Sequence, residues 1–228
     1  MADVKPEASH GRTDHRLLRQ TGLRHFLSDR QIRDLERICR TLTKRGGTTL
    51  FRQDETADTL YVCLEGSVEL RARPPGRRVY RTVEVVGEGC TFGDEALFGQ
   101  DRYLTSARAL EQARILVLSK AAFERLSGSN PDVATGILQC SGSCLLQTLR
   151  RSAILTQSPA DIGLKLLLEE LAASGGKHNG HMAPVHITHA QLAGVLHLSR
   201  ETVSRMLAHM EDQGAVRLGR GVIQVRMT

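Results

Sequence analysis

Turn residues divide the middle of the chain into short segments of strand-forming composition. Between Gly46 and Phe123 the turns are marked by Gly66, Pro74, Pro75, Gly76, Gly87, Gly89, Gly93 and Gly99. Short runs at regular spacing between turn signals are typical of an antiparallel sandwich or barrel. In "YVCLEGSVEL", Gly66 predicts a hairpin between two neighbouring runs. We therefore expect a β-roll domain over residues 22–130, preceded by a polar extension over residues 1–21.

A short helix is predicted before the β-rich region and a long one after it. The segment "SDRQIRDLERICRTL" has Ser28 as a candidate N-cap and apolar residues at helical spacing. Pro131 suits the first turn of the long helix, which we expect over residues 131–157. The apolar and small positions of the long helix are Val133, Ile137, Cys140, Cys144, Leu145, Leu149 and Ile154.

That stripe on the long helix needs a covering surface. The chain contains no second helix of similar length beside it, so the stripe predicts a homodimer built on a two-fold coiled coil. Packing of the same stripe against the chain's own β-domain is the alternative.

Residues 158–228 carry the pattern of a second, smaller domain. An amphipathic helix with Ser158 as N-cap and Pro159 at its first position precedes a flexible connector. A short helix from about His189 to Leu196, a tight turn, a second helix and two strands around "GRG" follow. Helix, turn, helix and hairpin in this order are the layout of a winged helix-turn-helix. The whole chain is therefore expected to be an α+β protein.

The second helix of this motif lies in "LHLSRETVSRML". Thr188 and Ser199 are predicted N-caps of the two helices. Glu201, Ser204 and Arg205 share one face, because they stand at i, i+3 and i+4. Arginine can pair with guanine, glutamate can accept a hydrogen bond from cytosine, and serine can bond either kind of base edge. The face therefore predicts a helix that reads DNA bases, with an ordinary solvated helix as the alternative.

The order of β-sandwich, long helix and winged helix-turn-helix resembles the cyclic-AMP receptor protein / fumarate-nitrate regulator (Crp/Fnr) family of bacterial transcription factors. The strongest match is "ITHAQLAGVLHLSRETVSRMLAHMEDQGAV", and "FRQDETADTLYVCLEGSVEL" and "CTFGDEALFG" support it. The resemblance extends from about Gly22 to Met227. One departure is His197, where many relatives carry glycine; histidine tolerates a left-handed backbone better than most residues.

The resemblance also implies a DNA sequence and a set of contacts. The fumarate-nitrate branch has Glu-x-x-Ser-Arg in the reading helix, which this chain matches at residues 201–205. It implies an inverted repeat of TTGAT or TTGA half-sites, with the two helices of a dimer about one DNA turn apart. RNA polymerase is the implied protein partner of such a regulator. The residues expected at phosphates, which position the protein, are Thr188, Ser199, Arg200 and Thr202.

The β-domain resembles a cyclic-nucleotide-binding fold whose effector pocket is altered. In cyclic-AMP binders a Gly-Glu pair meets the ribose, and here Gly93 precedes Asp94 and Glu95. The later pair of arginine and hydroxyl residue is broken, because Arg102 is followed by Tyr103. A buried cyclic phosphate would then lack its main counter-charge. We expect a vestigial pocket, no dependence on cyclic AMP, and no cofactor, with a regulator that responds to a cyclic nucleotide as the alternative.

Other signals remain open. The five cysteines are scattered, without the clustered spacing of an iron–sulfur site or a zinc ribbon. A haem could still use His10, His15, His25 or Cys63. Cys140 and Cys144, one turn apart on the long helix, could report oxidation by approaching their symmetry mates. A regulator without any effector, controlled by its own expression level, is equally compatible.

Composition and motifs exclude several classes. No P-loop, nucleophile elbow or HExxH motif indicates an enzyme. The formal net charge of +6 fits a polyanionic partner such as duplex DNA. A ligand-binding module without DNA contact is the remaining alternative. The polar N-terminus lacks the apolar core of a secretion signal, and no segment has the apolar length of a membrane span, so a cytoplasmic protein is expected.

Overall fold

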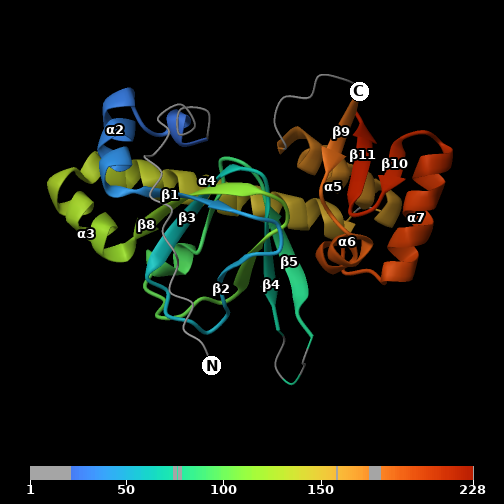
Figure 1. The fold of residues 1–228 in the computed structure, drawn as a ribbon, viewed down its shortest axis with the longest axis horizontal. Coiled ribbons are helices and arrows are strands. Elements are labelled where there is room, and N and C mark those ends of the chain that lie inside the picture. Colours follow the sequence, from blue (N-terminus) through green and yellow to red (C-terminus); the bar gives the residue numbers. More distant parts are fainter. Residues whose placement is uncertain (1–21, 74–75, 77–78, 158, 175–180, 228) are drawn as a thin grey trace.

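The computed structural model describes residues 22–73, 76, 79–157, 159–174 and 181–227 (Figure 1). The polar extension with His10 and His15, and the candidate N-cap Ser158, lie outside the described residues. Within the described part of the chain, no helix combines the length and apolarity required to cross a membrane.

The N-terminal domain is an antiparallel β-sandwich, as the spacing of turns predicted. Its strands are β1 (Arg40–Lys44), β2 (Thr49–Phe51), β3 (Thr59–Glu65), β4 (Val68–Ala72), β5 (Arg81–Val86), β6 (Thr91–Phe92), β7 (Ser106–Ala109) and β8 (Ala113–Ser119). They form one sheet of order β1-β8-β3-β6 and a second of order β2-β7-β4-β5. The short 3-10 helices η1 (Gly22–His25) and η2 (Asp94–Ala96) accompany them.

The predicted first helix is shorter than expected. α2 (Asp29–Ile38) begins as predicted, with a capping box in which the Ser28 side chain accepts from the backbone of Gln31. The prediction was wrong beyond Ile38, because Arg40–Lys44 is the edge strand β1, paired with β8. The β-branched residues Thr41 and Thr43 favour a strand, and β8 supplies hydrogen-bond partners from a distant part of the sequence.

The predicted hairpin at Gly66 is also wrong. β3 pairs with β8 and β6, whereas β4 pairs with β5 and β7, so the turn carries the chain from one sheet to the other. Gly66 has a φ of +80°, and a Cβ there would meet the carbonyl oxygen of Gln112 at 2.6 Å. Glycine is required at this crossing because the backbone is left-handed and closely packed.

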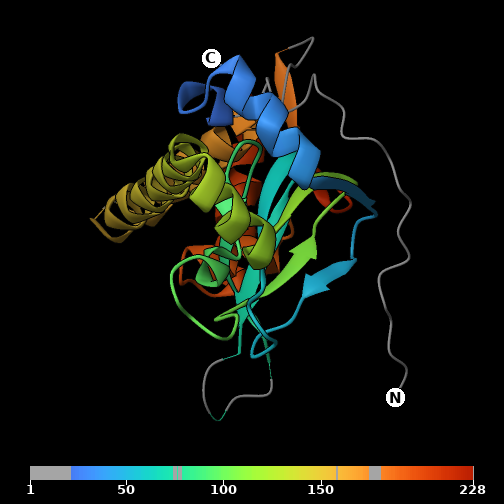
Figure 2. The same cartoon turned by 90° about the vertical axis from the view of Figure 1, so that its left-hand side faces the viewer.

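α3 (Lys120–Ser129) leads into the long helix α4 (Pro131–Gln157). Figure 1 shows α4 running behind the β-sandwich toward the C-terminal domain, and Figure 2 shows it at the outer edge of the molecule. The predicted single stripe divides into two faces. Val133, Ile137 and Cys140 are buried in the core beside α2 and β8. Among the side chains of α4 that the structure describes, which exclude Ile154, the large apolar residues that are exposed are Leu138, Leu145, Leu146 and Leu149.

The C-terminal domain confirms the predicted winged helix-turn-helix. It consists of α5 (Ala160–Ser174), β9 (Met182–Val185), α6 (His189–Val195), α7 (Arg200–Asp212), β10 (Val216–Gly219) and β11 (Val222–Arg226). The strands form a sheet of order β10-β11-β9. The core contains Leu164 and Leu168 of α5, Leu192 of α6, and Val203 and Leu207 of α7, all fully buried.

Leu168→Ala tests this second core. The substitution is expected to lower the free energy of unfolding by about 2–5 kcal/mol, because it leaves a cavity at a fully buried site. Lys165→Ala on the exposed face of α5 is the control and should change stability by no more than about 0.5 kcal/mol. Urea unfolding followed by circular dichroism makes the comparison, and equal effects would contradict the assigned core.

Candidate nucleic-acid interface

The orientation of α7 is set by its cap and its buried side. Ser199 is the N-cap, and its Oγ accepts from the backbone N–H of Thr202 at 3.1 Å. Val203 and Leu207, four residues apart, are completely buried against the rest of the C-terminal domain. Because these anchors fix one side of α7 inward, the opposite side faces out.

The turn before α7 contains the predicted left-handed residue. His197 has a φ of +55°, as its place in the usual glycine position requires. The turn closes when the backbone N–H of Leu198 donates to the carbonyl of Ala193 at 3.0 Å. The departure from glycine therefore leaves the helix-turn-helix geometry intact.

The three residues predicted to read bases are not equally available. Glu201 and Arg205 are exposed one turn apart on α7, whereas Ser204 is half-buried. The Ser204 Oγ lies 2.8 Å from Nδ1 of His189, the first residue of α6. Sequence reasoning missed His189, because its contact with Ser204 depends on how two helices cross.

The residues expected near phosphates lie at the starts of the two helices. Thr188 caps α6 in a capping box with Gln191, and Thr188, Ser199 and Arg200 are exposed. The Thr202 hydroxyl, 2.9 Å from that of Ser199, is partly committed to the cap of α7.

The hairpin wing adds basic groups that the motif search did not single out as DNA contacts. β10 and β11 pair around the turn, where Gly221 has a φ of +76°. The backbone N–H of Leu218 donates to the Glu211 carboxylate at 2.7 Å and ties the wing to α7. Arg217 and Arg220 are exposed on this hairpin.

The interior of the sensor domain is aromatic where the altered pocket was expected. Tyr103 is 3% exposed, and its ring stacks on Phe51 with 3.9 Å between centroids. Its hydroxyl donates to the carbonyl of Thr59 at 2.8 Å and accepts from the Thr59 N–H at 3.1 Å. Tyr61 and Phe92 extend the cluster. Aromatic rings thus fill the interior around Tyr103, one of the residues expected in the altered pocket.

The remaining pocket residues are engaged elsewhere. The exposed Arg102 guanidinium donates to the carbonyl of Asp54 at 2.5 Å, and Glu95 accepts from the backbone of Leu104 at 3.0 Å. Gly93 caps η2 with a φ of +72°.

Asp94 faces the long helix. Its carboxylate accepts from Ser141 of α4 at 3.3 Å and from Thr91 at 3.3 Å. Burial raises the pKa of Asp94 to about 6. This side chain therefore joins η2 to α4 instead of lining an open nucleotide pocket.

The open suggestion of haem ligation gains no support from Cys63. The thiol is fully buried and donates to the Gly66 carbonyl at 3.3 Å, and burial raises its pKa above the ordinary value. His25 is exposed on η1. Among the described residues, no three or more His, Cys, Asp or Glu side chains are grouped so that they could hold a metal ion.

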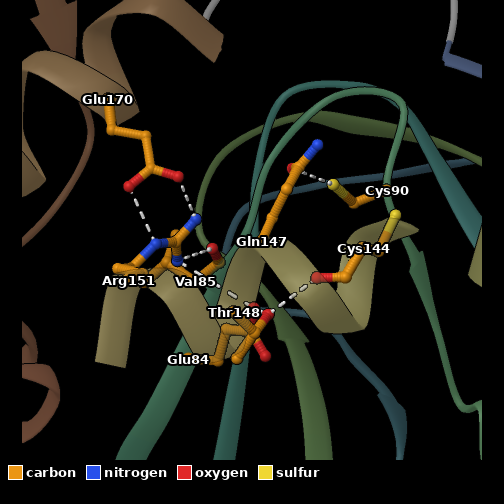
Figure 3. Close-up of polar contacts among 8 residues, drawn as sticks. All are labelled: Glu84, Val85, Cys90, Cys144, Gln147, Thr148, Arg151 and Glu170. Carbon is orange, nitrogen blue, oxygen red and sulfur yellow. Dashed lines mark hydrogen bonds and ion pairs between the residues drawn. The ribbon is translucent and has the colours of Figure 1, made fainter. Parts of the chain in front are cut away.

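A half-buried arginine joins the two domains at the end of α4. Arg151 donates to both oxygens of Glu170 on α5, at 2.6 and 2.8 Å (Figure 3). On its other side it lies 3.9 Å from the Glu84 carboxylate and 3.5 Å from the Val85 carbonyl of β5. Bidentate pairing holds the guanidinium in one orientation, so α4, α5 and β5 share one polar junction.

The first helix of the helix-turn-helix also contacts the sensor domain. α6 packs on β5, where a Cβ added to Gly194 would meet the Cβ and the carbonyl oxygen of Thr82 at 3.0 Å. Beside this contact, a cavity of about 430 Å³ separates the domains and is lined by residues that include Arg71, Tyr80 and Arg108.

His197→Gly tests the left-handed turn. Removing the strain of a left-handed non-glycine residue is expected to raise the free energy of unfolding by about 1–2 kcal/mol. The greater flexibility of glycine in the unfolded chain lowers it again by about 0.5–1 kcal/mol. A gain of about 0.5–1 kcal/mol in unfolding free energy is expected by urea titration. His197→Val is expected to destabilise, since a β-branched residue tolerates a positive φ poorly. Destabilisation by His197→Gly would contradict this account.

Comparison with known proteins agrees with both domains. Residues 42–130 match the family model of the cyclic nucleotide-binding domain, and residues 164–227 match that of the Crp-like helix-turn-helix domain. The cyclic AMP receptor protein of Thermus thermophilus is 30% identical over 182 residues, which cover 79% of this chain and 81% of that protein. The nitrogen fixation regulation protein FixK of Azorhizobium caulinodans is 28% identical over 173 residues, 74% of this chain and 68% of FixK.

Solved structures show the same architecture. A CRP/FNR-family transcriptional regulator from Thermus thermophilus is similar with a TM-score of 0.66 and 26% identity, over 82% of this chain and 93% of the other. FixK2 from Bradyrhizobium japonicum shares the fold, with a TM-score of 0.69 and 19% identity over 83% and 93%. These relatives are transcription regulators and not enzymes. The chain belongs to the Crp/Fnr family of DNA-binding transcription regulators.

Proposed function

We propose that the protein is a homodimeric regulator that reads an inverted repeat of TTGAT or TTGA half-sites through α7, without requiring cyclic AMP. The observation that carries the proposal is the outward face of α7, where Glu201 and Arg205 are exposed above the buried anchors Val203 and Leu207. A rigid helix with a polar outer face has the dimensions to enter a major groove.

Each side chain on this face has a distinct role in the proposal. Arg205 pairs with the O6 and N7 atoms of a guanine, and Glu201 accepts from a cytosine N4. Ser204 uses its hydroxyl toward a base edge, while His189 holds that hydroxyl in place from α6. A glutamate next to phosphates is repulsive, so its exposed position between two arginines supports base reading over simple charge attraction.

The phosphate contacts come from the same motif and from the wing. Thr188, Ser199, Arg200 and Thr202 surround the N-termini of α6 and α7, where backbone N–H groups favour anions. Arg220 of the wing adds a positive charge at the end of the hairpin. These groups position the protein on DNA and carry no sequence information of their own.

The exposed face of α4 supports a homodimer. Leu138, Gly142, Leu145 and Leu149 follow the 4-3-4 spacing of a coiled-coil seam, and the three leucines are 41%, 58% and 56% exposed. A Cβ on Gly142 would meet no atom within 4 Å, so glycine there leaves space for a second helix. A two-fold contact along this seam would bring two copies of α7 to one side of a DNA duplex.

The aromatic interior of the sensor domain supports independence from cyclic AMP. Tyr103, which the family resemblance aligns with the phosphate-binding arginine of cyclic-AMP binders, is buried, and Arg102 donates to the Asp54 carbonyl. An activator that needs no small-molecule signal, and whose activity is controlled by its own expression level, fits this arrangement. The second candidate is response to a different small molecule, which the interdomain cavity beside Arg71 and Arg108 favours. In either case the regulator acts in the cytoplasm with RNA polymerase as its partner.

Arg205→Ala tests the base reading. Fluorescence anisotropy with a TTGAT-N4-ATCAA duplex is expected to show a loss of about 1–3 kcal/mol and relaxed preference at one base pair. Arg200→Ala is the matched control and should weaken the specific and a scrambled duplex alike, with a smaller salt dependence. Added cyclic AMP should leave the affinity of the wild type unchanged. Equal losses on both duplexes for Arg205→Ala would contradict its role in base reading.

Leu145→Glu tests the seam. A carboxylate at the centre of a coiled-coil face is expected to convert the dimer to a monomer in sedimentation equilibrium, because two buried like charges would face each other. The control is Gln139→Glu, an exposed position on another side of α4. A monomeric wild type, or a dimer that is unaffected by Leu145→Glu, would count against this interface.

A further inference from the structure

Three thiols from distant parts of the sequence meet where the turn after β5 touches α4. Cys90 lies in that turn, whose backbone contacts Cys63 of β3 on its other side. Cys140 and Cys144 lie one helical turn apart on the inner face of α4. Figure 3 shows the Cys90 and Cys144 side chains next to each other, and the Cys140 thiol reaches the carbonyl of Gly89, the residue before Cys90. The sequence had singled out Cys140 and Cys144 for contact with their symmetry mates and had omitted Cys90, which is 50 residues from Cys140 in the chain.

The burial of Cys140 contradicts the idea that its thiol meets a symmetry mate. Cys140 is 1% exposed, and its Sγ lies 3.8 Å from the carbonyl oxygen of Gly89 in the same chain. Cys90 and Cys144 are half-buried, and Figure 3 shows their side chains beside each other above α4. The Cys90 Sγ lies 3.9 Å from Oε1 of Gln147. The three thiols thus form a cluster within one chain. Its half-buried members, Cys90 and Cys144, are accessible to a small reagent.

The three thiols differ in acidity. Hydrogen bonds from Cys140 and from Cys90 hold the pKa of the Cys144 thiol below its ordinary value. The same hydrogen bonds, with burial, raise the pKa of Cys140 and of Cys90. Since the thiolate is the nucleophile, Cys144 is the member that reacts first.

Helix geometry disfavours Cys140 as the disulfide partner of Cys144. Residues at i and i+4 of an α-helix have Cβ atoms about 5–6 Å apart, whereas a disulfide needs about 3.5–4.5 Å. Cys140 would have to distort α4 to reach that distance. Cys90 lies in a turn between strands, where small backbone movements are less costly than within a helix.

We propose that Cys144 is a peroxide-reactive thiol and that Cys90 resolves it into an intramolecular disulfide. The Cys144 thiolate attacks one oxygen of hydrogen peroxide, so that an S–O bond forms, the O–O bond breaks and the departing hydroxide takes up a proton to become water. The Cys90 thiol then attacks the sulfenic sulfur; an S–S bond forms and the second oxygen leaves as water. In sum, two thiols and one peroxide give a disulfide and two waters.

This modification site goes beyond the proposed function and does not depend on it. The pair bridges α4 and the turn after β5, and Glu84 of β5 meets Arg151 of α4 at the junction with the C-terminal domain. Thr148 of α4 also donates to Glu84 at 2.5 Å, four residues from Cys144. A covalent link at Cys90 therefore lies directly beside the contacts that join the domains.

The test treats the reduced full-length protein with equimolar hydrogen peroxide and maps its peptides by mass spectrometry without reduction. The expected result is one species lighter by two hydrogen atoms, with the Cys90 and Cys144 peptides linked. Cys90→Ser should stop at a sulfenic acid on Cys144, trapped by a cyclic diketone. Cys144→Ser should remain unoxidised at Cys90. Circular dichroism of each variant checks that it is folded.

Two controls sharpen the outcome. Cys140→Ala should still form the Cys90–Cys144 link, though more slowly, because Cys144 loses one stabilising hydrogen bond. Cys39 and Cys63, both buried with raised pKa values, should stay reduced in every variant. A wild type that remains reduced, a Cys140–Cys144 link, or a link between two chains would overturn the proposal.

Discussion

The packing of α4 against the sensor domain is the contact on which the remaining arrangement depends. With 27 residues, α4 is about 40 Å long at 1.5 Å per residue, which is sufficient to span both domains. Its inner face contributes Val133 and Ile137 to the sensor core, and its far end places Arg151 against Glu170. Because α4 is one rigid helix that contacts both domains, it fixes the C-terminal domain relative to the sensor domain. Its outer face remains apolar and exposed.

The polar junction at Arg151 and the close packing of α6 on β5 hold the two domains together in different ways. The guanidinium is held between Glu170 and Glu84, and burial raises the pKa of Glu84. Removing one member would leave a half-buried charge without its partner, which is costly. The contact of Gly194 with Thr82 is instead steric and depends on the absence of a side chain. The DNA-binding domain is thus seated on the sensor domain by two contacts of unlike chemistry.

Local signals in the sequence were reliable where the chemistry is local. Ser28, Thr188 and Ser199 cap their helices as predicted, because a cap involves residues three positions apart. The positive φ of His197 followed from its place in a known turn. The strand at Arg40–Lys44 was missed because β8, its partner, comes more than 65 residues later. The prediction of a hairpin at Gly66 failed for a related reason. The strands on either side of Gly66, β3 and β4, pair with distant strands and belong to different sheets.

The sequence by itself determined the order of domains, the helix caps and the residue types on the face of α7, because each depends on spacing within a few residues. Tertiary structure alone decided which side of α4 is buried and which is exposed, since that depends on a surface built from other strands. It also brought Cys90 to Cys144 and His189 to Ser204, and it filled the sensor interior with Tyr103. These contacts join residues whose proximity comes from packing, and no local pattern encodes them.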